Sequence, residues 1–178
     1  IYMNLVLIGY RATGKSTIAD LLHLRLAMPV YHMDSLLEER FGERIADFVA
    51  KHGWDAFRDS EESLVKELAL LDQVIIDTGG GVVTREANVQ ALRRNGFLVW
   101  LRSDPEKIAE RISWNTDRPS LTGAKSAVEE VMDVLRIREP LYEAAADFQL
   151  VTDDYSLSRC AEIILEAWRD WNEALETP

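Results

Sequence analysis

The sequence predicts an α/β fold: a five-stranded parallel sheet with helices on both faces, forming three layers. Three observations support this prediction. The chain contains short continuous apolar runs, which are typical of strands buried on both faces. Longer segments with apolar residues at helical spacing separate these runs, and that alternation favours a parallel sheet. Two of the runs end at glycine-rich loops, and ligands of such sheets bind beyond the carboxyl ends of the strands.

The apolar runs are the candidate strands. The first, Leu5-Val6-Leu7-Ile8, is entirely apolar and stops at Gly9, so we expect a strand that is buried on both faces. The full set of expected strands is Leu5–Ile8, Val30–Met33, Val74–Ile76, Phe97–Leu101 and Phe148–Val151.

Helical patterns fill the intervals between the strands. In the first of them, Ile18 and Leu22 recur at the spacing of one helix face. We expect helices at Ser16–Ala27, Ser35–Arg40, Ala56–Leu71 and Leu157–Trp171, one between Thr84 and the stop signal Asn95-Gly96, and one opening at Asp104-Pro105.

Composition and charge limit the function classes. The 178 residues suit a single domain spanning 1–178, and 20 basic against 31 acidic residues give a net charge of −11. Such a charge argues against nonspecific nucleic-acid or membrane-surface binding, while a small anion needs only a local positive pocket. The single cysteine, Cys160, excludes an intrachain disulfide and reads as a small buried apolar residue.

The same features set the expected location and assembly. No apolar run reaches the roughly 18 residues of a membrane span, and the first residues lack the basic segment and cleavage site of a signal peptide. We therefore expect a cytoplasmic protein. We also expect a monomer, since no long heptad pattern stands out.

A phosphate loop follows the first predicted strand. The segment Gly9-Tyr10-Arg11-Ala12-Thr13-Gly14-Lys15-Ser16-Thr17 matches G-x-x-x-x-G-K-[ST] and opens a predicted helix. Glycines let such a loop wrap with its N–H groups inward, and the helix N-terminus adds positive charge. Lys15 would then reach the β and γ phosphates, and the Ser16 hydroxyl would ligate Mg²⁺. The expected ATP-binding residues here are Ala12, Thr13, Gly14, Lys15, Ser16 and Thr17.

A second glycine loop, Asp77-Thr78-Gly79-Gly80-Gly81, follows the third predicted strand. Three consecutive glycines raise the entropy of the unfolded chain, so they indicate close approach of a ligand to the backbone. A flexible connector is the alternative that this loop alone leaves open.

Taken in order, these motifs resemble the shikimate kinase family, from about Met3 to Leu150. The most specific matches are Asp34, Phe57-Arg58, the triple glycine and Arg138-x-Pro-x-Tyr. The remaining matches are Glu38, Gly42, Ile45-Ala46-Asp47-Phe48, Glu61, Arg111, Arg118-Pro119 and Asp147. The resemblance implies the P-loop kinase fold with a mobile lid. It also implies ATP-dependent phosphorylation of the 3-hydroxyl of shikimate, giving 3-phosphoshikimate and ADP in aromatic amino-acid biosynthesis.

The resemblance assigns the acceptor site to residues suited to shikimate. Arg58 and Arg138 would hold the substrate carboxylate through charge-assisted hydrogen bonds. Asp34 would orient the attacking hydroxyl, as a general base, although Asp is also a favoured cap for the helix Ser35–Arg40. The N–H groups of Gly80 and Gly81 would donate to the substrate. Glu61, three residues after Arg58, could orient that arginine, because i and i+3 side chains are neighbours on a helix.

The polar stretch at about residues 112–124 resembles the family's lid. Arg118 would swing over the phosphates and offset the charge that develops during transfer. Lid closure would also exclude water from the reaction. Arg111 matches the family arginine near adenine. In charged helical or loop sequence, either arginine could instead be an ordinary solvated residue.

The sequence departs from the family pattern at one point. The family usually has Asp-x-Asp after the second strand, whereas this chain has His32-Met33-Asp34. A neutral imidazole is a poor Mg²⁺ partner, because Mg²⁺ prefers hard oxygen ligands. If the third strand lies beside the first, Asp77 could replace the missing carboxylate at Mg²⁺. It could equally cap the glycine loop through backbone amides.

Two competing functions remain from the sequence alone. One is another small-molecule kinase of this fold, gluconate-like or acting on a nucleoside monophosphate; the two expected acceptor arginines favour an acidic acceptor over a neutral sugar. The other is a catalytically weak nucleotide-binding regulator, which only His32 supports. A regulator would need none of the retained motif residues, which therefore count against it: Lys15, Ser16, Asp34 and Arg118.

Overall fold

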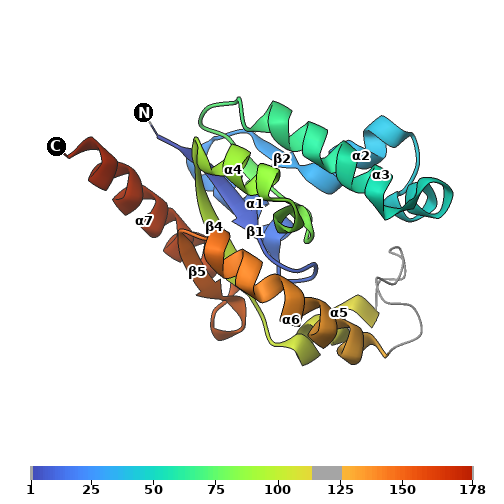
Figure 1. Cartoon of the computed structure of the whole chain (residues 1–178). Helices are drawn as coiled ribbons and strands as arrows, with labels where there is room; N and C mark the ends of the chain where they lie inside the picture. The colour runs from blue at the N-terminus through green and yellow to red at the C-terminus, as the bar shows by residue number, and fades with distance from the viewer. Residues whose placement is uncertain (1, 114–125, 178) are drawn as a thin grey trace.

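A computed structural model describes residues 2–113 and 126–177. Its centre is a five-stranded parallel sheet in the order β2-β3-β1-β4-β5 (Figure 1). The predicted parallel sheet is therefore confirmed. The strands are β1 (Asn4–Ile8), β2 (Val30–His32), β3 (Ile75–Asp77), β4 (Gly96–Arg102) and β5 (Phe148–Val151).

Helices connect the strands and cover both faces of the sheet. They are α1 (Lys15–Leu26), α2 (Met33–Phe41), α3 (Ile45–Leu68), α4 (Glu86–Arg93), α5 (Pro105–Ser113), α6 (Ala127–Ala145) and α7 (Leu157–Glu176). Two short 3₁₀ turns, η1 (Val82–Thr84) and η2 (Thr152–Asp154), follow β3 and β5.

Alternate residues of β1 belong to two separate apolar cores. Val6 and Ile8 pack with α2 to α6, while Leu5 and Leu7 pack with α1 and α7. All four side chains are fully buried, and each such burial stabilises the fold by about 1.5–3 kcal/mol. This is the continuous apolar pattern of a central strand covered on both sides, and it fixes the phosphate loop at the carboxyl end of β1.

Several predicted boundaries differ from those in the structure. Met33 is not the end of the second strand but the first residue of α2. The helix predicted at Ala56–Leu71 corresponds to the second part of α3, which runs from Ile45 to Leu68 with a break at Gly53. Helix α3 reads as two patterns because Gly53, with φ +86°, interrupts the helical backbone and kinks it.

The predicted lid falls largely outside the described residues. Ile112 and Ser113, which we expected to begin it, belong to the end of α5, and residues 114–124 lie outside the described ranges.

The two ends of the described chain are tied together. The Met3 amide donates to Asn172 Oδ1 of α7 at 2.8 Å, and Trp168 Nε1 donates to the Met3 carbonyl at 2.9 Å. Figure 1 accordingly shows both termini at the same end of the molecule. Cys160 is fully buried in α7, as expected of a small apolar residue. Within residues 2–113 and 126–177, no helix is both long and apolar enough to cross a membrane.

Candidate active site

The phosphate loop wraps around the space beyond β1. Gly9, Ala12 and Gly14 all have positive φ angles, of +144°, +62° and +94°. A Cβ atom on Gly9 would lie 2.5 Å from the Leu101 carbonyl oxygen, so only glycine fits there. The buried Lys15 Nζ donates to the carbonyl oxygens of Gly9 and Tyr10, both at 2.8 Å. The lysine head group therefore lies against the backbone of the loop itself.

Ser16 and Asp77 meet at the start of α1. Because β3 lies beside β1, with Asp77 level with Leu7, its carboxylate lies next to the phosphate loop. The Ser16 hydroxyl donates to Asp77 Oδ2 at 2.7 Å. The condition set for Asp77 in the sequence, that the third strand lies beside the first, is therefore met. The Thr78 amide bonds to the Leu7 carbonyl, so Asp77 does not cap that amide.

His32 contacts the same carboxylate from β2. Its Nδ1 lies 2.7 Å from Asp77 Oδ2, and its Nε2 lies 2.8 Å from Asp20 Oδ1 on α1. Burial alone lowers the pKa of His32, but the hydrogen bonds to the two carboxylates outweigh burial and raise the pKa above its usual value.

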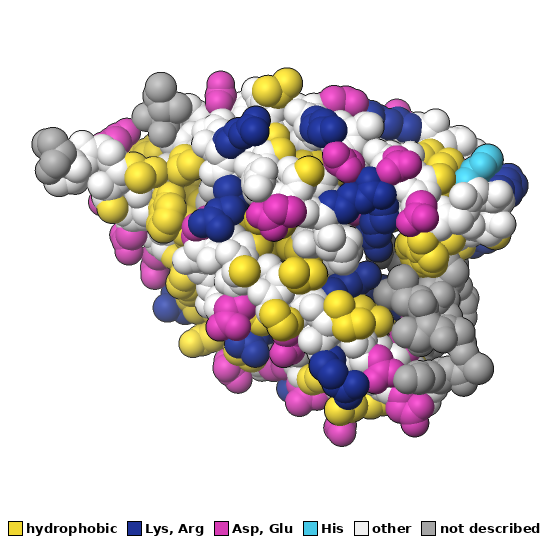
Figure 2. All heavy atoms as spheres, viewed as in Figure 1, with side chains coloured by type: hydrophobic (Ala, Val, Ile, Leu, Met, Phe, Trp, Pro, Cys, Tyr) yellow, Lys and Arg dark blue, Asp and Glu magenta, His cyan; other side chains and the backbone are white. Residues whose placement is uncertain are grey.

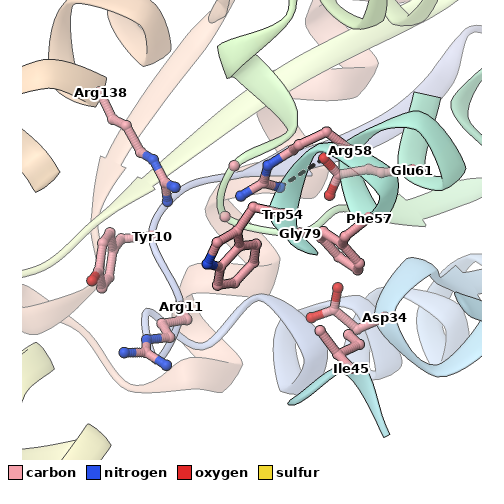
Figure 3. A pocket seen from close by; sticks show the side chains of 12 residues that line it. Tyr10, Arg11, Asp34, Ile45, Trp54, Phe57, Arg58, Glu61, Gly79 and Arg138 are labelled. Atoms are coloured by element: carbon pink, nitrogen blue, oxygen red, sulfur yellow. Dashed lines mark hydrogen bonds and ion pairs between the residues drawn. The ribbon is translucent and has the colours of Figure 1, made fainter. Parts of the chain in front are cut away.

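A second pocket opens between the glycine loop, α3 and α6. Its lining includes Arg58 from α3 and Arg138 from α6, and Figure 3 shows the two guanidinium groups reaching toward the same region. Arg58 lies over the rings of Trp54 and Phe57, with 5.4 and 5.2 Å from its Cζ to the ring centroids. Arg138 is buried, with its Cζ 5.9 Å from the Tyr10 ring. These contacts hold two positive charges in a confined space.

Glu61 forms an ion pair with one of these arginines, Arg58. Arg58 Nη1 donates to Glu61 Oε1 at 2.8 Å, which is the i, i+3 contact expected from the sequence. Burial raises the pKa of the Glu61 carboxyl, and the charge of Arg58 acts in the opposite direction. Glu61 Oε2 is buried and accepts no hydrogen bond from the described residues. The ion pair therefore fixes the guanidinium of Arg58, which lines the pocket.

Asp34 lies in the same pocket, facing the glycine loop. The alternative that Asp34 caps α2 is wrong, since the helix begins at Met33 with His32 in the capping position. The Asp34 side chain lines the pocket in the first turn of α2 instead (Figure 3). A Cβ atom on Gly79 would lie 3.1 Å from Asp34 Oδ1. The backbone of the glycine loop thus passes directly against this carboxylate.

The triple glycine also packs against both arginines. A Cβ atom on Gly81 would overlap the Arg58 guanidinium, and one on Gly80 would lie 3.6 Å from Arg138 Nη1. The loop is no flexible connector, because it packs closely against both arginines, and a side chain at Gly81 would fit only if the Arg58 guanidinium moved. The Tyr142 hydroxyl, from α6, donates to the Gly80 carbonyl and fixes the loop further.

Replacing Tyr142 by Phe should lower the free energy of unfolding by about 1–2 kcal/mol, because the Gly80 carbonyl loses a buried donor. The phenyl ring keeps its stacking on Trp100, 5.5 Å between centroids. Urea unfolding followed by far-UV circular dichroism measures the change. Tyr155→Phe, at a residue 47% exposed, is the matched control. Equal unfolding free energies for Tyr142→Phe and the unmodified chain would contradict the prediction.

Arg111 lies on the other side of the phosphate loop. Its Nη1 donates to the Ala12 carbonyl at 2.9 Å, and its Nη2 lies 3.6 Å from Asp153 Oδ1. It lines a cavity of about 800 Å³ together with Tyr155 and Leu157. The predicted Arg118 lies outside the described residues.

Sequence reasoning missed three sets of site residues. Trp54 precedes Arg58 by one helical turn, so helical spacing could have found it. Tyr10 and Arg11, inside the phosphate-loop motif, line the pocket that holds Arg58 and Arg138. The segment 152–157 lines the cavity beside Arg111, and its position after the fifth strand was the available signal.

A phosphate loop with its lysine and a serine–aspartate pair lies beside a pocket holding two arginines and a carboxylate. On this three-layer sheet, the arrangement defines a P-loop kinase of small molecules, since the loop suits a nucleotide and the pocket suits an anionic acceptor. A family model described as "Shikimate kinase" matches residues 11–169. The chain belongs to the shikimate kinase family.

Individual relatives agree with this assignment. The chain is similar to the shikimate kinase of Nitratidesulfovibrio vulgaris, 44% identical over 143 residues, covering 79% of this chain and 81% of the relative. It is 36% identical to that of Rhodopirellula baltica over 168 residues, covering 92% and 89%. The structure of shikimate kinase from Acinetobacter baumannii in complex with shikimate superposes with a TM-score of 0.89 at 26% identity. That superposition covers 99% of this chain and 96% of the other.

Proposed function

We propose that this protein transfers the γ-phosphoryl group of ATP to the 3-hydroxyl of shikimate, giving 3-phosphoshikimate and ADP. The observation that carries the proposal is the pocket in which Arg58 and Arg138 face Asp34 beside the phosphate loop. Family membership supports the same reaction. The step would belong to the biosynthesis of aromatic amino acids, by a single-domain monomer in the cytoplasm.

The acceptor pocket fits a small hydroxylated carboxylate. Arg58 and Arg138 would bind the carboxylate, since two guanidinium groups offer paired donors in fixed planes. Amides of Gly80 and Gly81 would donate to the substrate from the loop packed against these arginines. On the face shown in Figure 2, basic and acidic side chains are intermingled, so local pocket charge rather than a broad basic surface would attract the anion.

The nucleotide would lie on the opposite side of the phosphate loop. Backbone N–H groups of residues 12–17 would hold the phosphates, and Lys15 would contact the β and γ groups. Arg111, with Tyr155 and Leu157, lines the cavity that would take the adenine. Arg118 completes the proposed set as the residue that offsets charge during transfer.

Magnesium is the divalent ion that these residues fit. The Ser16 hydroxyl and the Asp77 carboxylate are hard oxygen donors 2.7 Å apart, and both line one cavity of about 350 Å³ with Lys15. Two protein oxygens suffice, because Mg²⁺ keeps several waters and binds substrate phosphates. Mg²⁺ would neutralise part of the phosphate charge. Asp77 would supply the carboxylate that His32 does not.

Replacing Asp77 by Asn should raise the Mg²⁺ concentration for half-maximal rate by about tenfold or more, because the amide removes the negative charge at the ion. Steady-state rates over a Mg²⁺ titration at saturating ATP and shikimate measure this shift. Asp72→Asn, in the turn before β3, provides the control. An unchanged Mg²⁺ dependence would assign Asp77 a purely structural role.

Asp34 would hold the attacking hydroxyl and accept its proton. Its position in the first turn of α2 directs the carboxylate into the pocket, across from the two arginines (Figure 3). A substrate whose carboxylate is bound by the arginines would then turn its hydroxyls toward Asp34. Positioning of this kind supplies much of the catalysis in phosphoryl transfer.

A coupled assay of ADP release with ATP and Mg²⁺, with and without shikimate, tests the proposal. ADP release that depends on shikimate is the expected result. Gluconate and a nucleoside monophosphate serve as parallel acceptors. Release that depends on either of them instead would identify a different acceptor. Nucleotide binding with no acceptor-dependent release would point to a regulator.

A further inference from the structure

Four polar side chains are linked by successive contacts at the proposed magnesium side of the phosphate loop. Ser16 Oγ donates to Asp77 Oδ2 at 2.7 Å, His32 Nδ1 contacts the same oxygen at 2.7 Å, and His32 Nε2 contacts Asp20 Oδ1 at 2.8 Å. Of these four side chains, the proposed function uses only Ser16 and Asp77, which leaves His32 and Asp20 without a role.

The strand register and the helix spacing bring these four residues together. His32 and Asp77 are register partners on the neighbouring parallel strands β2 and β3. Ser16 and Asp20 are four positions apart on α1, so they share one helix face. This helix face lies against the ends of the two strands. There Ser16 contacts Asp77, and Asp20 contacts His32.

The contacts place His32 where it can hold the Asp77 carboxylate still. A carboxylate oxygen accepts, so the imidazole donates to Asp77 from Nδ1. Asp20 engages the other ring nitrogen and fixes the orientation of the ring. Both contacts on Asp77 use Oδ2, so Oδ1 takes no part in them. Outer contacts of this kind orient metal-binding carboxylates, and their loss commonly weakens metal binding 10- to 100-fold.

We infer that His32, held by Asp20, is a positioning residue that fixes the Asp77 carboxylate for the divalent cation accompanying ATP. The inference rests on the proposed function in taking Asp77 as the cation-side carboxylate. It gives His32 a role that differs from ligation: the imidazole acts on the cation through Asp77. It also explains why a residue that is itself a poor Mg²⁺ ligand can stand at this position.

Equilibrium binding of ATP over a Mg²⁺ titration, without shikimate and without turnover, tests the inference. Isothermal titration calorimetry yields the ATP affinity in EDTA and the Mg²⁺ concentration that gives half of the full enhancement. For His32→Ala, that concentration should rise about tenfold or more, while the affinity in EDTA stays within twofold. His32→Asn should recover most of the loss, because its amide nitrogen can donate from the place of Nδ1.

Asp20→Ala provides a second variant at an exposed site that leaves the core untouched. It should cause a smaller shift than His32→Ala, and the double variant should be no worse than His32→Ala alone, because both act through one contact. His52→Asn, at an exposed histidine of α3, is the matched control and should change neither value. Thermal unfolding of each variant verifies that it is folded.

Two results would overturn the inference. In the first, the Mg²⁺ concentration that gives half of the full enhancement of ATP affinity is, for His32→Ala, within twofold of its value for the unmodified protein. The other is an equal loss of ATP affinity with and without Mg²⁺, which would place the effect on the nucleotide pocket. A separate observation would contradict the proposed reaction. The protein would then release no ADP in response to shikimate, although its Mg²⁺-dependent ATP binding responds to the substitutions as described.

Discussion

Replacing Asp34 by Asn should lower kcat for phosphoryl transfer to shikimate by about 10²–10⁴-fold, the range typical for loss of a general base. Asn has nearly the same volume, so the pocket against Gly79 stays filled. The amide accepts no proton from the attacking hydroxyl, while the carboxylate-binding arginines remain in place. Affinities for ATP and shikimate should therefore change much less than kcat.

The ADP-release assay gives kcat, and quenching of tryptophan fluorescence gives shikimate affinity, because Trp54 lines the acceptor pocket. Asp55→Asn, at an exposed position of α3, controls for a change of acid to amide elsewhere. A kcat within about threefold of the unmodified protein would remove Asp34 from the chemistry and leave it a binding role.

Adding a methyl group at Gly81 should raise the KM for shikimate by about 10- to 100-fold. The new Cβ would overlap the Arg58 guanidinium, which must move away from the position that Glu61 fixes. A hydrogen bond to a charged group contributes about 1.5–3 kcal/mol, and its loss accounts for a change of this size. The KM for ATP should stay unchanged, because Gly81 lies on the acceptor side.

Gly42→Ala separates this effect from the general cost of replacing glycine. Gly42 has a positive φ of +65° but open space around its Cα, so the substitution strains the backbone without touching the site. Combining Gly81→Ala with Arg58→Met should give no further loss beyond Arg58→Met, since both disturb one contact. A normal KM in Gly81→Ala would contradict the proposed role of Arg58.

The fold could be predicted from the sequence because its strongest signals are local. The continuous apolar run at residues 5–8 predicts a buried strand that ends at a glycine loop, and β1 is found there. The missed boundary at Met33 depends on contacts outside the local pattern. Met33 has the apolar character of a strand residue, yet it starts α2 and is buried in the core beneath that helix.

The site was predicted residue by residue where a motif exists, and it was incomplete where only tertiary structure brings residues together. Lys15 and Ser16 follow from spacing within a loop motif, whereas Arg58 was expected only from the resemblance to the family. Asp20 carries no motif, and its contact with His32 arises from the meeting of α1 and β2. Trp54 differs from Asp20, because it lies one helical turn before Arg58 in the part of α3 after Gly53, so its spacing was an available signal.

The strand order also determines when the chain can begin to fold during synthesis. Leu5 of β1 pairs with Ile75 on one side and with Phe97 on the other, so the central strand has no partner until these segments emerge from the ribosome. At 5–20 residues per second, an apolar strand would stay unpaired for roughly 4–14 s while about 70 further residues are added. Contacts of such long range also slow folding of the complete chain. The phosphate loop, which follows β1 directly, is therefore synthesised early but becomes ordered only after much of the chain has been added.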